Sequence, residues 1–219
     1  MANPSSSIPR PEQGDVVELI LDDHRRFESL LRDLRNDQND RDVLRRQIAE
    51  LLVAHGEAEE SEVYPQLERK DAIDEEEAEH GKKEHDEGYE TLLPLLEADD
   101  LYDEDFSDHI HEFSETLLHH IDEEERDILN PAREDISAED RARLGAAWLG
   151  ERNRMLDEGC GSVEQVRALV VISPMVVQTS SVRRSKTSAR APPQSPKTTS
   201  GTRPKTPVSP TYAEEPVSA

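Results

Sequence analysis

The sequence predicts an all-α protein: an up-down-up-down four-helix bundle, followed by a short extra C-terminal helix and a disordered tail. Apolar residues recur every three or four positions in four successive segments, as on the buried face of an amphipathic helix. Glycine is scarce within the first 135 residues, and charged residues make up 35% of the 219-residue chain. We therefore expect the bundle at 15–135, an accessory helix at 136–158 and a flexible, Ser/Thr/Pro/Lys/Arg-rich tail at 159–219.

The four bundle helices are expected at 15–36, 41–69, 74–98 and 103–131. In the first, the core-facing row is Ile20, His24, Phe27, Leu31 and Leu34. In the second it is Leu44, Ile48, Leu52, His55, Glu59 and Val63. In the third it is His85, Tyr89, Leu92 and Leu96, and in the fourth it is Ile110, Phe113, Leu117, His120, Glu124 and Ile128. Each row steps by three or four residues and contains one histidine.

Beyond the bundle, the sequence predicts a shorter fifth helix and then a tail. Ser137 stands at a capping position and acidic residues follow it, as at many helix starts. The apolar residues available to pack on the bundle are Leu144, Trp148 and Met155. From Ser180 onward the chain has almost no large apolar residues, so it cannot bury enough surface to fold. Its basic stretch, 183–205, could contact an anionic partner or the acidic bundle, and the sequence identifies neither.

One chemical pattern occurs twice, 65 residues apart: His55-x-x-x-Glu59-Glu60 and His120-x-x-x-Glu124-Glu125. Residues four apart share a helix face, so each pair can offer an imidazole and a carboxylate to one ion. The neighbouring His119 falls instead among glutamates on a solvated face. The repeat therefore predicts a metal held between helices.

Six polar groups fall on the four core-facing rows: His24, His55, Glu59, His85, His120 and Glu124. With the expected helix bounds, all six lie at one level of the bundle, to within about one helical turn. An unpaired polar side chain costs roughly 1–3 kcal/mol to bury, and an ionised carboxylate costs more. Coordination of a cation would remove that penalty. We therefore predict that these six residues bind metal.

On these motifs, residues 15 to 135 resemble the hemerythrin-like, HHE cation-binding family of four-helix bundles. The matching segments are Asp23-His24-Arg25, His55-x-x-x-Glu59-Glu60-x-x-Val63-Tyr64-Pro65, Glu84-His85 and His120-x-x-x-Glu124-Glu125-x-x-Ile128. The resemblance implies a non-haem di-iron centre, with carboxylates bridging two iron ions and histidines capping them. Carried over by position, the metal ligands would be His24, His55, Glu59, His85, His120 and Glu124.

The chain departs from the oxygen-carrying hemerythrins on the third helix, which in those proteins supplies two histidines four apart. Here the position four before His85 is Gly81. His80 is five residues away, about 140° around the helix, and is expected to face solvent. Another carboxylate or a water could complete the metal shell. Glu60 and Glu84 are adjacent candidates, although both are expected on the surface. The departure argues against simple reversible oxygen carriage more than against metal binding.

Three other metal chemistries have single features of the sequence in their favour. Glu77-x-x-His80 has the spacing of ferritin-like di-iron bundles, but it occurs once and off the core-facing row, whereas that fold needs it twice. Zinc also accepts histidine and carboxylate. Six mixed nitrogen and oxygen ligands suit two ions better than one tetrahedral zinc. The loop acids Asp99, Asp100, Asp103 and Glu104 could bind calcium weakly, yet they lack the regular alternation and central glycine of an EF-hand loop.

Charge and composition restrict the remaining functions. The formal net charge is −24 while the tail is basic, so the bundle is strongly acidic and is not expected to bind nucleic acid. No apolar run of 18 residues exists and the start lacks a signal pattern, so we expect no membrane span and a cytoplasmic location. The single cysteine, Cys160, excludes an intrachain disulfide and is interpreted as an incidental thiol.

These observations leave three functional hypotheses. The first is a non-haem di-iron protein that binds or senses a small ligand: dioxygen, peroxide or nitric oxide. The second is a di-iron enzyme that decomposes hydrogen peroxide. The third is a metal-free interaction bundle. The sequence does not decide whether the protein is an enzyme.

Overall fold

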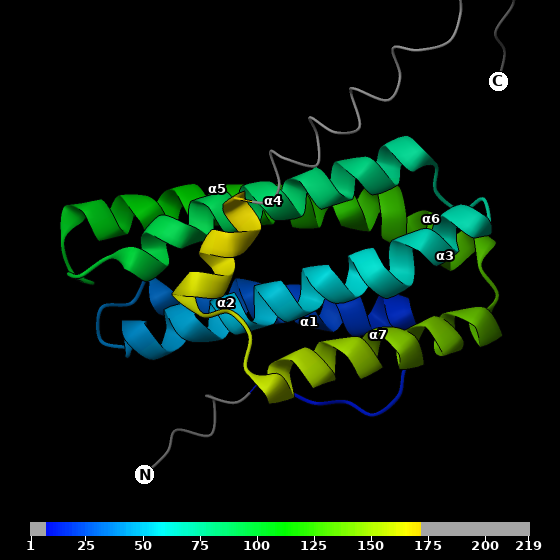
Figure 1. Cartoon of the computed structure of the whole chain (residues 1–219), viewed down its shortest axis with the longest axis horizontal. Coiled ribbons are helices and arrows are strands. Elements are labelled where there is room, and N and C mark those ends of the chain that lie inside the picture. Colours follow the sequence, from blue (N-terminus) through cyan, green and yellow to red (C-terminus); the bar gives the residue numbers. More distant parts are fainter. Residues whose placement is uncertain (1–7, 172–219) are drawn as a thin grey trace, which may run out of the picture.

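The computed structural model describes residues 8–171, and every regular element in that range is helical. The bundle consists of α1 (Val16–Leu34), α2 (Arg41–Ala58), α4 (Glu75–Glu97) and α5 (Glu104–Glu124). Helix α1 packs against α2, and α4 packs against α5 (Figure 1). The predicted all-helical bundle is therefore confirmed.

The longer helices begin where short polar side chains can cap their first turn. In each case the capping oxygen accepts a hydrogen bond from a backbone N–H two or three residues later. The capping residues are Asp15, Asp40, Asp74, Asp103 and Ser137. A negative charge here also suits the positive end of the helix dipole, which explains why acidic residues mark these starts.

The second and fourth predicted helices are each interrupted by a wider, π-helical turn. The first is η1 (Glu59–Val63), followed by α3 (Tyr64–Arg69). The second is η2 (Glu125–Leu129), followed by α6 (Asn130–Asp135). Both wide turns stand where a histidine–glutamate motif ends, and such turns are frequent at functional sites.

A proline accompanies each wide turn. Pro65 is the second residue of α3 and Pro131 is the second residue of α6. Proline has no N–H to donate and its ring clashes with the carbonyl four residues earlier, which disfavours an undisturbed α-helix. The one-residue offset of Pro131 relative to its motif matches a one-residue offset of η2. The proline spacing thus follows the wide turn.

Helix α7 (Ala138–Glu158) lies outside the bundle and packs against α1 and α2 (Figure 1). The structure differs from the prediction just after it. Residues 163–171, expected to be part of the flexible tail, form a further helix. Val166 is fully buried against the bundle core and Cys160 is buried beside it, so apolar contacts hold this segment. The rest of the predicted tail, 172–219, lies outside the described residues.

The apolar core of residues 8–171 is divided into two clusters, one toward each end of the bundle. Along α1, Ile20 belongs to one cluster and Phe27 to the other. Along α2 and η1, Leu52 belongs to the same cluster as Phe27, and Val63 belongs to the same cluster as Ile20. The predicted histidines of these two helices lie between the clusters. A polar layer therefore separates the two apolar clusters of the core.

Gly145 permits the close packing of α7 on the N-terminal segment. A Cβ atom at this position would overlap the carbonyl oxygen of Gly14 and lie 3.1 Å from the backbone nitrogen of Val16. We expect Gly145→Ala to lower the free energy of unfolding by about 1–3 kcal/mol, because backbone must move to admit the methyl group.

Gly150 on the same helix is the matched control. Its Cβ would meet no heavy atom of the described chain within 4 Å. Gly150→Ala should therefore raise stability by about 0.5–1 kcal/mol through helix propensity. Urea unfolding of both variants measures the contrast, and equal effects would show that α7 does not depend on this contact.

No helix among residues 8–171 combines the length and the apolar character that crossing a membrane requires.

Candidate metal centre

All six residues predicted from the core-facing rows lie in the polar layer. Each is exposed by 3% or less: His24, His55, Glu59, His85, His120 and Glu124. They come from α1, α2, the start of η1, α4 and α5. The structure therefore brings together every side chain in the predicted set, which we call the central residues.

The four central histidines form two pairs. His24 of α1 and His55 of α2 have ring centroids 5.3 Å apart. His85 of α4 and His120 of α5 have ring centroids 4.7 Å apart. Each pair joins two neighbouring helices on one side of the bundle.

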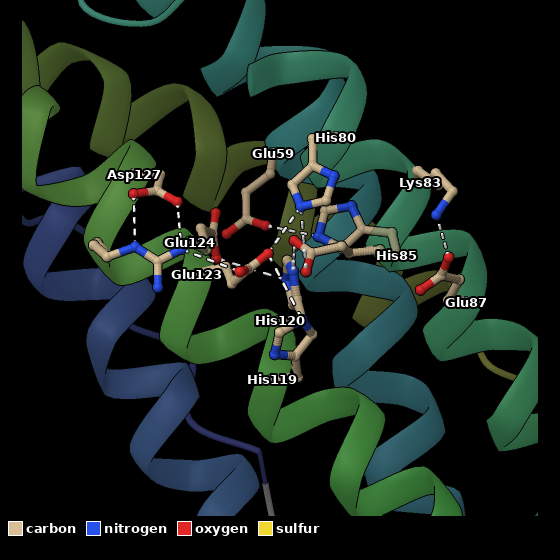
Figure 2. A network of polar contacts seen from close by, with 12 residues as sticks. Glu59, His80, Lys83, His85, Glu87, His119, His120, Glu123, Glu124 and Asp127 are labelled. Atoms are coloured by element: carbon tan, nitrogen blue, oxygen red, sulfur yellow. Dashed lines mark hydrogen bonds and ion pairs between the residues drawn. The ribbon is translucent and has the colours of Figure 1, made fainter. Parts of the chain in front are cut away.

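The two central glutamates connect these pairs. Glu59 places one carboxylate oxygen 3.1 Å from His55 Nε2 and the other 3.3 Å from His85 Nε2. Glu124 Oε2 lies 3.1 Å from His24 Nε2 and 3.7 Å from His120 Nε2. Figure 2 shows Glu59 and Glu124 beside His85 and His120. Each carboxylate thus reaches both histidine pairs.

Every central histidine turns its Nδ1 atom toward a second carboxylate. His24 faces Glu125 at 2.9 Å, and His55 faces Asp23 at 3.4 Å. His85 faces Glu60 at 3.0 Å, and His120 faces Glu84 at 3.2 Å. A carboxylate at Nδ1 favours a proton there and leaves the Nε2 lone pair for the interior. We call Asp23, Glu60, Glu84 and Glu125 the outer carboxylates.

The expectation that Glu60 and Glu84 lie on the surface is wrong for Glu84. This residue is 6% exposed and its carboxylate bonds His120 across the α4–α5 contact. Glu60 is partly exposed. Each outer carboxylate is a direct sequence neighbour of a central residue, and that adjacency is the signal that could have identified all four.

Helix α7 also reaches the centre, which the sequence reasoning missed. The buried guanidinium of Arg152 donates two hydrogen bonds to the Asp23 carboxylate, at 2.6 and 2.7 Å. Trp148, one turn earlier, meets His55 edge to face with ring centroids 5.8 Å apart. Arg152 interrupts an otherwise apolar row at spacing four on α7, and that interruption was the available signal.

Burial and neighbouring charges give the central histidines different proton affinities. Burial lowers the pKa of His24, but the carboxylates of Glu124 and Glu125 outweigh it and raise the pKa to about 9. Burial also lowers the pKa of His85, but the carboxylates of Glu59 and Glu60 outweigh it and raise the pKa to about 10. At His55 burial prevails and lowers the pKa to about 4. Burial and the nearby charge of His85 also lower the pKa of His120.

The pKa values of the two central glutamates, Glu59 and Glu124, also shift in opposite directions. Burial and the charge of Glu124 raise the pKa of Glu59 to about 8. Burial also penalises Glu124, but His24 and the other histidines hold its pKa below the usual range. Tyr64 donates a hydrogen bond to Glu124 at 3.1 Å. In the absence of a cation, Glu59 is the carboxylate that retains a proton.

Several inward atoms of the centre lie within ion-pair distance of one another but form no hydrogen bond among residues 8–171. They are the Nε2 atoms of His55, His85 and His120 and both carboxylate oxygens of Glu59. Buried polar atoms are nearly always paired. Imidazole nitrogens and carboxylate oxygens pointing at one another are also the donors that first-row transition metals accept. The donor set therefore fits a bound metal.

At Gly81, the position four before His85 where the oxygen-carrying hemerythrins have a histidine, the side chain of Tyr64 lies close to the backbone of α4. A Cβ atom at Gly81 would lie 3.0 Å from the hydroxyl oxygen of Tyr64 and 3.2 Å from its ring. The Tyr64 ring also stacks on His85, with centroids 6.0 Å apart. The phenol of Tyr64 therefore fills the space beside Gly81.

Comparison with protein families agrees with this geometry. Residues 15–132 match the family model described as the hemerythrin HHE cation-binding domain. No curated protein and no solved structure matched the chain. The matched region contains the six central residues and the four outer carboxylates, and it ends before α7. On this match, which covers more than half of the chain, the protein belongs to the hemerythrin family of HHE cation-binding domains.

Proposed function

We propose that the protein is a non-haem di-iron protein whose buried centre binds a small ligand: dioxygen, peroxide or nitric oxide. The observation that carries the proposal is the pairing of four histidines into two sets, each reached by both central glutamates. Four of these six side chains present inward atoms without hydrogen-bond partners in the described chain.

Two ions account for the arrangement better than one. His24, His55 and Glu124 offer ligand atoms that all lie within 4.8 Å of one another. His85, His120 and Glu59 remain for a second ion on the α4–α5 side. Structural zinc is usually held by four ligands in a closed tetrahedron, which would leave part of this set unused. Four imidazoles with two shared carboxylates therefore favour a pair of ions, which we propose to be iron.

The residues of this chain would hold and orient such a centre. The outer carboxylates keep the Nδ1 protons in place and aim each Nε2 atom inward. The apolar clusters at both ends keep bulk water away. Burial and the nearby glutamates raise the pKa of Tyr64 well above its ordinary value, so its phenol keeps its proton and donates to Glu124. Bound iron would supply redox chemistry and a position for the small ligand.

Exposure of the iron-loaded protein to nitric oxide and to hydrogen peroxide tests this function. We expect stoichiometric nitric oxide binding, seen as new visible absorption and lost in His120→Ala. Sustained oxygen release from peroxide, also lost in His120→Ala, would instead establish the peroxide-decomposing enzyme. An iron-loaded protein whose spectrum responds to neither compound would contradict the proposal.

A further inference from the structure

A second group of metal-type side chains lies outside the buried centre, where α4 and α5 face each other. His80, Glu84 and Glu123 offer ligand atoms that all lie within 4.8 Å of one another. His80 Nε2 lies 2.9 Å from Glu123 Oε2 and 3.8 Å from Glu84 Oε1. His80 is exposed, as expected from the sequence, and Figure 2 shows it above His120 and close to Glu123.

These three residues line a surface cavity of about 300 Å³. Seven of its ten lining residues carry carboxylates, and neither lysine nor arginine is among the ten. The cavity wall also includes Glu124, a central residue. A cavity of one charge concentrates counter-ions and raises their association rate. This cavity therefore attracts cations toward the buried centre.

Glu84 contacts both the buried centre and the surface cluster that it forms with His80 and Glu123. It is 6% exposed, and its Oε2 atom pairs with Nδ1 of the central His120. Its Oε1 atom is buried, has no hydrogen-bond partner among residues 8–171, and lies on the side of His80. A buried carboxylate oxygen without a partner is costly. A cation held with His80 and Glu123 would satisfy it.

Glu123 can serve as a ligand although it already has neighbours. Arg126 bonds its Oε1 atom at 3.1 Å, whereas its Oε2 atom faces His80 at 2.9 Å. The more distant His119 Nε2 lies 3.7 Å from Oε2. A divalent cation between His80 and Glu123 would take the place of their direct contact, while Arg126 would keep the carboxylate in position.

We propose that His80, Glu84 and Glu123 form a separate divalent-cation site that receives Fe²⁺ before it passes to the buried centre. The role in loading rests on the proposed di-iron function, whereas the existence of the site does not. A site at the cavity mouth that shares Glu84 with His120 would place incoming iron next to the central residues.

The existence of the site is tested with Mn²⁺, which accepts nitrogen and oxygen ligands. Full-length wild type and the double variant His80→Ala/Glu123→Gln are dialysed to equilibrium against Mn²⁺, and bound metal is counted. The matched control is His111→Ala/Glu115→Gln, another exposed histidine–glutamate pair, with its atoms 3.4 Å apart on α5. We expect the cavity variant to lose about one Mn²⁺ per chain and the control to lose none.

The role in loading is tested with Fe²⁺ under anaerobic conditions at limiting concentration. Loading of the cavity variant should be about tenfold slower than that of wild type and control, with the same final iron content. Equal Mn²⁺ binding by all three proteins would overturn the site. Loss of Mn²⁺ binding with unchanged iron loading would overturn its role in delivery. A wild type that takes up no iron would contradict the di-iron function, while the Mn²⁺ comparison would still decide the site.

Discussion

Replacing Glu59 with glutamine should abolish tight metal binding and, at the same time, stabilise the metal-free protein. Glu59 is fully buried and its carboxylate lies between His55 and His85. Burial and the charge of Glu124 raise its pKa to about 8. At pH 7 the folded metal-free protein keeps Glu59 protonated, whereas the unfolded chain ionises it, and this difference lowers stability. A neutral amide avoids that cost, so the free energy of unfolding should rise by roughly 1–3 kcal/mol at pH 7.

The pH dependence follows from the direction of the shift. Because the pKa of Glu59 is higher in the folded chain than its ordinary value of 4.5, the folded state binds more protons between these values. The metal-free wild type should therefore lose stability from Glu59 as the pH rises from about 4.5 toward 8. The metal-free Glu59→Gln variant should lack this loss of stability. Urea unfolding of both proteins at pH 5 and pH 8 measures it.

Glu124→Gln is the matched control at the corresponding position of the second motif. Here the pKa is lowered, because hydrogen bonding and charge from His24 outweigh burial. Removing this carboxylate breaks the charge-assisted contact at 3.1 Å and should destabilise the metal-free protein by about 1–3 kcal/mol. Both variants should lose metal. Equal destabilisation by the two, or full metal content in Glu59→Gln, would be incompatible with the arrangement described.

Arg152→Met should give the largest loss of stability, about 3–5 kcal/mol, because it leaves the buried Asp23 carboxylate without its cation. The Arg152 and His55 contacts help to lower the pKa of Asp23 below its ordinary 3.8, against the effect of burial. This stabilisation is therefore present above the ordinary aspartate pKa and is lost as the pH falls below it. Denaturant unfolding at pH 7 measures the loss.

The same variant should also weaken metal binding, by about 10- to 100-fold, since Asp23 orients His55. The double variant Asp23→Asn/Arg152→Met removes the stranded charge. It should recover much of the stability without recovering metal affinity, because the amide no longer holds His55 as a carboxylate does. Recovery of both properties together would mean that Arg152 acts on the fold alone.

The central residues were predictable because helical periodicity alone places them. His55 and Glu59 continue the row of Leu52, and a charged group on such a row needs a partner. The outer carboxylates could not be assigned in this way. Glu84 is about 100° around the helix from His85 and becomes buried only because α4 and α5 pack closely there.

The contribution of α7 depends on tertiary structure. Arg152 and Asp23 are 129 residues apart, and no local pattern pairs them. The wide turns η1 and η2 were also missed, because Pro65 and Pro131 signal a disturbed helix without specifying how it is accommodated. The sequence could predict which side chains meet, while packing between helices determines what orients them.

The most direct test of the account is the metal content of the purified, untagged protein, measured by elemental mass spectrometry after removal of loosely bound ions. The proposed di-iron function, with two histidine pairs joined by Glu59 and Glu124, predicts about two iron ions per chain. A protein that retains no stoichiometric transition metal, even after anaerobic loading with iron, would contradict it.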